Sequence, residues 1–169
     1  SGDTAKRCAK GFGELEYINN TGRNDFTCLK VCRDSENIYF YAETAEKITN
    51  PTDDNWMTLF IKLGNGKKGY NYAVNFEKPE KTGAVLSQCQ EDGQWKKIDV
   101  VAMKIEYNKM MLAISRETLE ISNNLVDFQF KWADNYRKNE KGQVDIYSFY
   151  CDGDAAPYGR MNYVYSEKV

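Results

Sequence analysis

Two carboxylates near the end of the chain, Asp152 and Asp154, are the residues whose type and spacing could do chemistry. A pair of carboxylates roughly 5–10 Å apart can hydrolyse a glycosidic bond. Two aspartates in a Gly- and Pro-containing turn more often accept hydrogen bonds from backbone amides. Because no accompanying nucleophile or acid marks a catalytic pair, the sequence favours a shaped turn, followed by a strand.

Oxygen ligands for calcium are a second interpretation of the same aspartates. The candidate ligands are Asp152, Asp154 and Asp134. Asp152-Gly153-Asp154 is followed by Ala-Ala-Pro, so it lacks the ligand spacing of an EF-hand loop. A structural calcium ion would therefore need ligands that converge from separate loops.

Aromatic side chains give the richer signal, with 3 Trp, 12 Tyr and 8 Phe. Sugar rings stack their apolar faces on aromatic rings, while neighbouring polar side chains bind the hydroxyl groups. Trp56 follows a polar loop at the start of an expected strand, which predicts a ring near the surface. Trp132 continues an alternating apolar set and is expected in the core.

Composition excludes several functional classes. The chain has no histidine, which removes histidine-dependent catalysis and histidine-ligated zinc. Its net charge of −2, without runs of like charge, argues against nucleic acid as a partner. Five cysteines without a CxxC pair do not indicate a disulfide scaffold. No apolar stretch is long enough to cross a bilayer, so we expect no membrane insertion by this domain.

Alternation of apolar and polar residues dominates the pattern, and no segment of a dozen residues keeps a helical period. The expected strands are Phe26–Cys32, Asn37–Thr44, Trp56–Leu63, Tyr70–Phe76, Ala84–Cys89, Val101–Tyr107, Met110–Ser115, Val126–Trp132, Ile146–Cys151 and Met161–Tyr165. Many short strands separated by turn signals predict an all-β, two-sheet antiparallel β-sandwich of the jelly-roll or immunoglobulin-like kind, with at most short helical turns. We expect one sandwich over residues 25–169, with residues 1–24 as a lead-in packed on it.

Several motifs, in this order, resemble the family 9 carbohydrate-binding modules and related DOMON-like β-sandwiches. They are NIYFYAET at 37–44, DDNWMTLFIKL at 53–63, GYNYAVNF at 69–76, MLAISRETL at 111–119, FQFKWADN at 128–135 and GDAAPYGRMNYVY at 153–165. The resemblance covers roughly residues 25–165. The chain is similar to modules of secreted Bacteroidetes proteins that are attached to glycoside hydrolases.

The resemblance implies a two-sheet sandwich, frequent structural calcium, and a terminal sugar clamped between two tryptophans. Trp56 matches the first tryptophan, and Tyr158 stands near the place of the second. We therefore expect a non-catalytic carbohydrate-binding module of a secreted, periplasmic or cell-surface protein. The expected glycan contacts are Trp56, Tyr158, Tyr70, Asn71, Asn75, Arg116 and Arg160, and no cofactor beyond calcium is expected.

Two alternatives from other classes remain open. The first is a docking domain that packs on an adjoining catalytic domain and binds no sugar, which predicts a large exposed apolar patch. The second is an enzyme with two facing carboxylates in a cleft.

Overall fold

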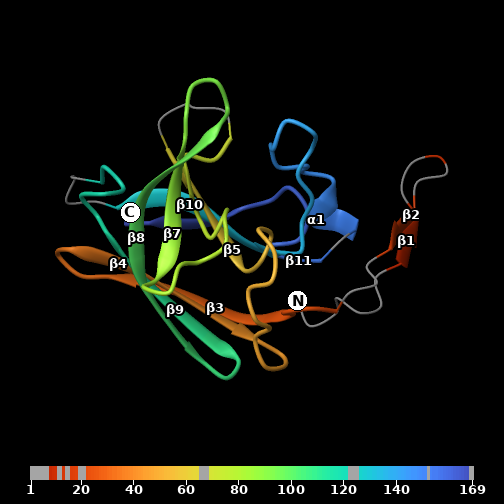
Figure 1. Cartoon of the computed structure of the whole chain (residues 1–169), viewed down its shortest axis with the longest axis horizontal. Coiled ribbons are helices and arrows are strands. Elements are labelled where there is room, and N and C mark those ends of the chain that lie inside the picture. The colour runs from red at the N-terminus through yellow and green to blue at the C-terminus, as the bar shows by residue number, and fades with distance from the viewer. Residues whose placement is uncertain are drawn as a thin grey trace.

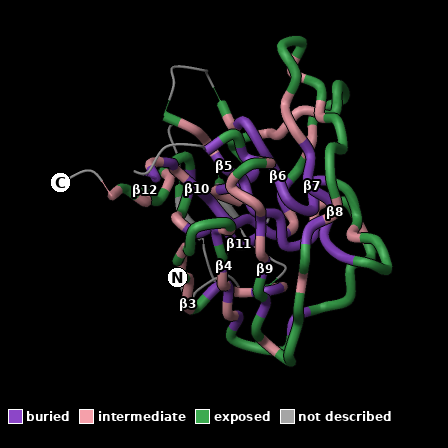
Figure 2. Tube along the Cα trace, turned by 90° about the vertical axis from the view of Figure 1, so that its left-hand side faces the viewer, coloured by how far each residue is buried: buried purple, intermediate pink, exposed green. Residues whose placement is uncertain are grey.

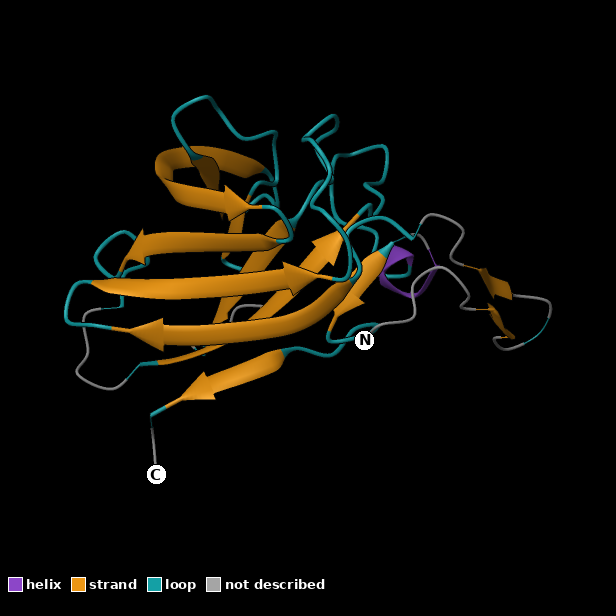
Figure 3. Ribbon diagram, turned by 90° about the horizontal axis from the view of Figure 1, so that it is seen from below, coloured by secondary structure: helices purple, strands orange, loops and turns teal. Residues whose placement is uncertain are grey.

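Strands make up almost all of the regular structure, together with one short helix (Figure 3). The computed structural model describes residues 8–10, 13, 16–18, 22–64, 69–121, 126–151 and 153–167. Ten strands form the main sheet: β3 (Phe26–Arg33), β4 (Asn37–Thr44), β5 (Thr58–Leu63), β6 (Tyr72–Val74), β7 (Ala84–Cys89), β8 (Trp95–Glu106), β9 (Lys109–Ser115), β10 (Asp127–Asp134), β11 (Asp154–Ala156) and β12 (Tyr163–Ser166). A separate hairpin joins β1 (Cys8–Lys10) to β2 (Glu16–Ile18), and α1 spans Ser148–Cys151 (Figure 1).

Every pairing in the main sheet is antiparallel, in the order β11-β10-β5-β6-β7-β8-β9-β4-β3, with β12 also on β10. The long strand β8 pairs with β7 through its first half and with β9 through its second half. The sheet thereby curls into a nearly closed, barrel-like form. The prediction of an all-β, antiparallel fold is confirmed. The strands form one continuous sheet, whereas two separate sheets were expected.

The core fills the inside of the curl (Figure 2). Alternation along β4 buries Ile38, Phe40 and Ala42, which face Phe128, Phe130 and Trp132 of β10 in the same cluster. Burying each large apolar side chain contributes about 1.5–3 kcal/mol. A second cluster lies on the opposite face of β5, β6 and β10, where Phe60, Phe76, Tyr136 and Phe149 pack together. Helix α1 and the segment before it cover this second cluster.

Most expected strands are confirmed, and β4 and β7 have the expected bounds. The prediction of a strand at Ile146–Cys151 is wrong, because this segment turns and forms α1. The Asp145 side chain accepts a hydrogen bond from the Tyr147 amide, and its carbonyl accepts one from the Ser148 amide. These local bonds start a turn in place of a strand. Strand β8 begins at Trp95, earlier than expected, and β11 was not expected at all.

Candidate functional site

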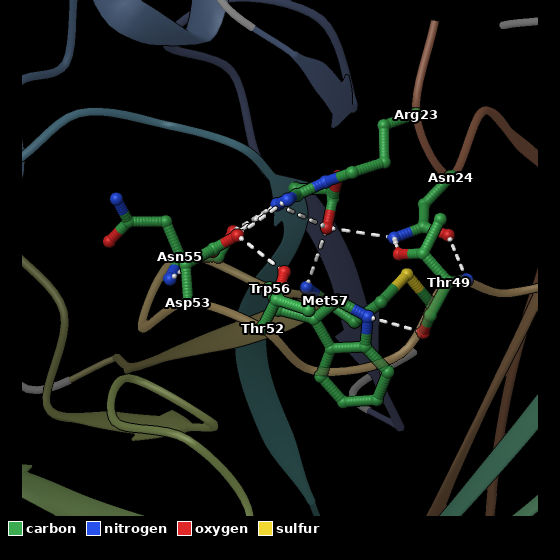
Figure 4. Close-up of polar contacts among 9 residues, drawn as sticks. Arg23, Asn24, Thr49, Thr52, Asp53, Asn55, Trp56 and Met57 are labelled. Atoms are coloured by element: carbon green, nitrogen blue, oxygen red, sulfur yellow. Dashed lines mark hydrogen bonds and ion pairs between the residues drawn. The ribbon is translucent and has the colours of Figure 1, made fainter. Parts of the chain in front are cut away.

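Trp56 does not reach the surface, so the prediction of an exposed sugar platform at this position is wrong. Its side chain is 1% exposed within the main core, and its indole N–H donates to the Thr49 carbonyl at 2.8 Å (Figure 4). Strand β5 begins only at Thr58, and the turn before it, with Met57 at a φ of 40°, directs the Trp56 ring inward. Neither face of the ring is open to a ligand.

An ion-pair network surrounds the turn that precedes β5 (Figure 4). The Arg23 guanidinium contacts Asp53 at 2.6 Å and Asp134 at 2.7 Å. Asp134 also accepts hydrogen bonds from the Asn24 side chain at 3.0 Å and from the Met57 amide at 2.9 Å. Burial disfavours the charged guanidinium, but the two carboxylates outweigh burial and raise the pKa of Arg23. Burial raises the pKa of the Asp134 carboxyl, and the contact with Arg23 opposes that rise.

Asp134 and Asp154 lie opposite each other in the pairing of β10 with β11. Asp154 is buried, and its Oδ2 accepts a hydrogen bond from the Phe26 amide at 2.7 Å. The two aspartates thus hold the chain from Arg23 to Phe26 against the end of the sheet. Asp152 lies outside the described residues. Among the residues that are described, no group of three or more acidic or cysteine side chains could hold a metal, and calcium binding stays a prediction.

Replacing Asp154 by alanine should lower the melting temperature, because the buried Phe26 amide loses its acceptor. Leaving such a donor unpaired costs about 1–3 kcal/mol, which corresponds to several degrees in a domain of this size. Asp99→Ala is the matched control, since the Asp99 side chain is exposed and accepts a hydrogen bond from the neighbouring Val100 amide. Equal melting temperatures for Asp154→Ala and Asp99→Ala would contradict this role.

Residues 157–162, here named the closing segment, connect β11 to β12 and bring several of the predicted site residues together. The Tyr158 ring is 40% exposed and packs edge-on against Tyr150, with ring centroids 5.3 Å apart. The Arg160 amide donates to the Tyr150 hydroxyl at 3.3 Å, and the Arg160 residue is exposed. The Tyr70 hydroxyl donates to the side-chain oxygen of Asn162 at 2.9 Å. Tyr70, Tyr158 and Arg160 are therefore all linked to this segment.

Lys131 of β10 contacts the start of the closing segment from the interior of the domain. It is completely buried, donates to the Pro157 carbonyl, and places its ammonium 5.1 Å from the centre of the Phe149 ring. Burial lowers the pKa of this ammonium to about 7, although the charge of Asp154 acts in the opposite direction. The alternating pattern of residues 126–132 did not indicate that Lys131 is buried.

The remaining predicted contacts are not gathered at this surface. Asn71 is buried and accepts a hydrogen bond from the Leu63 amide at 2.7 Å. Asn75 is buried with a φ of 59°, and its amide donates to the Val85 carbonyl at 2.8 Å. Arg116 donates to the Ser35 carbonyl and lines a polar groove with residues from the β3–β4 turn. Asn71 and Asn75 thus have structural roles.

A pocket that the sequence did not reveal opens between β3 and β12. It has a volume of about 360 Å³ and is lined by Phe26, Thr27, Cys28, Leu29, Lys30, Val31, Phe130, Ala156, Tyr163, Val164 and Tyr165. The pocket exists because these two strands are opposite edges of the curled sheet, so it depends on the order of strand pairing. Alternation in the sequence does not determine that order.

Comparison with protein-family models, curated proteins and solved structures gave no match. In the part of the chain that the structure describes, no helix has the length and apolar character needed to span a membrane.

Proposed function

We propose that this domain is a non-catalytic carbohydrate-binding module whose glycan contacts lie on the closing segment. The observation that supports it best is the display of Tyr158, an exposed aromatic ring on a segment that is fixed to the body of the domain. Tyr158 offers an apolar face for a sugar ring, and the exposed Arg160 guanidinium offers several donors to hydroxyl groups.

The closing segment is held at both of its ends and in its middle. Lys131 binds Pro157, Tyr150 binds Tyr158 and Arg160, and Asn162 bonds to Tyr70 and to Gln129. Gly159 has a φ of +64° and lies against the Tyr150 ring, where an added side-chain atom would clash. A site that is already ordered loses less conformational entropy on binding, which favours a ligand contact at this segment.

Under the same proposal, the domain is a family 9-like sandwich with two layers. The layers meet at β8, where the pairing partner changes from β7 to β9. The parent protein would then be a secreted, periplasmic or surface protein that processes glycans. A terminal sugar would stack on Tyr158 alone, because Trp56 is in the core. A structural calcium ion would have Asp152 among its ligands.

Titration with a panel of plant and host polysaccharides by calorimetry tests the proposal. We expect saturable binding of at least one glycan, which Tyr158→Ala weakens at least about tenfold and Arg160→Ala weakens less. Tyr147→Ala is the matched control, since Tyr147 is also an exposed tyrosine but lies outside the closing segment. Absence of binding to the whole panel, or equal affinities for Tyr158→Ala and the wild type, would refute the proposal.

A further inference from the structure

The two edges of the main sheet run in the same direction. β11 and β12 pair with successive parts of one side of β10, so together they fill a single position in the sheet. The path from this position to β3 contains nine positions, each antiparallel to the next. In an alternating series of nine, the first and last strands are parallel. A closed antiparallel barrel needs an even number of strands, so this sheet cannot close on itself with its own pairing pattern.

The gap between β3 and β12, here named the seam, is fixed at both ends. At one end the Phe26 amide bonds to Asp154 beside β11. At the other end Arg33 contacts Glu167 with two hydrogen bonds, at 2.7 and 2.9 Å. Between these two contacts lies the 360 Å³ pocket, which is lined by six consecutive residues of β3, Phe26–Val31, and three of β12, Tyr163–Tyr165.

Backbone groups of β3 face the seam. The Asp34 amide bonds to the Asn37 carbonyl, which makes this pair a hydrogen-bonded one, and the pairing continues without a shift to Cys28. Because bonded and non-bonded pairs alternate along an antiparallel ladder, Cys32, Lys30 and Cys28 bond to β4. The N–H and C=O groups of Leu29 and Val31 therefore point to the seam, while their side chains pack on the core.

The same reasoning applies to β12. The Glu167 amide bonds to the Val126 carbonyl, so Tyr165 and Tyr163 form the bonded pairs with β10. The N–H and C=O groups of Val164 consequently point to the seam, and its side chain is 66% exposed. The Tyr163 and Tyr165 rings contact Phe130 and Phe128 at centroid distances of 5.5 and 5.2 Å, on the inner side of the sheet.

We propose that the seam accepts one extended polypeptide strand, antiparallel to both β3 and β12, from a protein partner. Such a strand would fill a tenth position in the sheet, and it would give both edges the antiparallel neighbour that their common direction requires. Main-chain bonds to Leu29, Val31 and Val164 would supply affinity, as in other cases of strand addition. Leu29, Val31, Tyr163 and Tyr165 select apolar residues at every second position of the partner strand.

Strand binding at the seam does not depend on the glycan site. It is a form of the docking alternative in which the docked partner is an extended strand. The partner strand would have its N-terminus near Arg33 and Glu167 and its C-terminus near Phe26 and Asp154. Its length is limited to about five residues by the contacts at the two ends of the seam, which matches the lining of the pocket.

A synthetic peptide of alternating Val and Thr residues, with lysines at both ends for solubility, is the probe. Titrated into the ¹⁵N-labelled domain to about 1 mM, it should slow amide hydrogen exchange of Leu29, Val31 and Val164 at least tenfold. A spin label on its N-terminus should broaden signals near Arg33 rather than near Phe26. A proline-interrupted peptide of otherwise identical composition is the peptide control and should give no protection.

Val164→Pro removes one seam-facing N–H and leaves the bonded pairs with β10 in place, so we expect at least fivefold weaker binding of the peptide. Val164→Thr keeps the N–H and should bind like the wild type, and Tyr158→Ala should do the same. The proposal would be overturned by the absence of saturable protection in the wild type, by equal binding of the peptide to Val164→Pro, or by broadening near Phe26. Protection that appears without peptide as the domain dimerises would also overturn it, because a second copy would then occupy the seam.

Discussion

Asp134→Ala should lower the free energy of unfolding by about 3–5 kcal/mol, the cost typical of removing one partner from a buried ion pair. The Asp134 side chain is fully buried and contacts the Arg23 guanidinium, the Asn24 side chain and the Met57 amide. In the variant, Asp53 is the ion-pair partner that the Arg23 charge keeps among the residues that the structure describes. The Met57 amide loses its acceptor as well, and the Asn24 side-chain amide keeps its hydrogen bond to the Thr49 hydroxyl but loses the one to Asp134. Urea denaturation measures the change.

Asp53→Ala is the control that isolates burial as the cause. Asp53 contacts the same guanidinium, but its side chain is 40% exposed, whereas that of Asp134 is 0% exposed. An ion pair with an exposed partner contributes about 0–1 kcal/mol. If both variants lost the same free energy, Asp134 would not be the centre of the network.

Lys131→Met should stabilise the domain at pH 6 by about 1–4 kcal/mol, because methionine has a similar volume and avoids the cost of burying the ammonium, which is what lowers the pKa of Lys131. The methionine can occupy the space beside Phe149 without carrying a charge. It also removes the donor to the Pro157 carbonyl, and this loss keeps the gain below the full cost of burying the ammonium.

The gain from Lys131→Met should depend on pH. The pKa of Lys131 is about 7 in the folded state and has an ordinary value of 10.5. Between these two pH values the unfolded chain binds more protons than the folded chain, so this lysine makes wild-type stability rise with pH. The difference between Lys131→Met and the wild type should be constant below pH 7 and then shrink, reaching its minimum near pH 10.5. Chemical denaturation at pH 6, 8 and 10 measures it, and a pH-independent difference would contradict burial of the charge.

Much of the fold could be predicted, because strands with one buried face have an alternating sequence. Asn37–Thr44 and Ala84–Cys89 were predicted as strands rich in aromatic and β-branched residues, and both have the predicted bounds. The pattern failed at Ile146–Cys151, where Asp145 starts a turn that competes with the extended chain. It also could not show that the sheet is one curled path with two parallel edges, since the order of pairing is decided by contacts between distant residues.

The candidate site could be predicted only in part. The exposure of Tyr158 followed from its position in a Pro- and Gly-containing turn. The burial of Trp56 did not follow from its polar neighbours, because the turn before β5 directs the ring inward through a left-handed residue, Met57. The role of Asp134 depends on Arg23, which is more than a hundred positions away in the chain. No local pattern links the two.

Glycan affinity of Tyr158→Ala against Tyr158→Phe, measured by calorimetry with the best ligand of the panel, is the most direct test of the central claim. Tyr158→Phe keeps the ring and loses only the hydroxyl, which bonds to the Tyr150 carbonyl at 3.3 Å. We predict an affinity near that of the wild type for Tyr158→Phe and a loss of at least about tenfold for Tyr158→Ala. Equal affinities for the two variants would contradict a glycan contact at the closing segment.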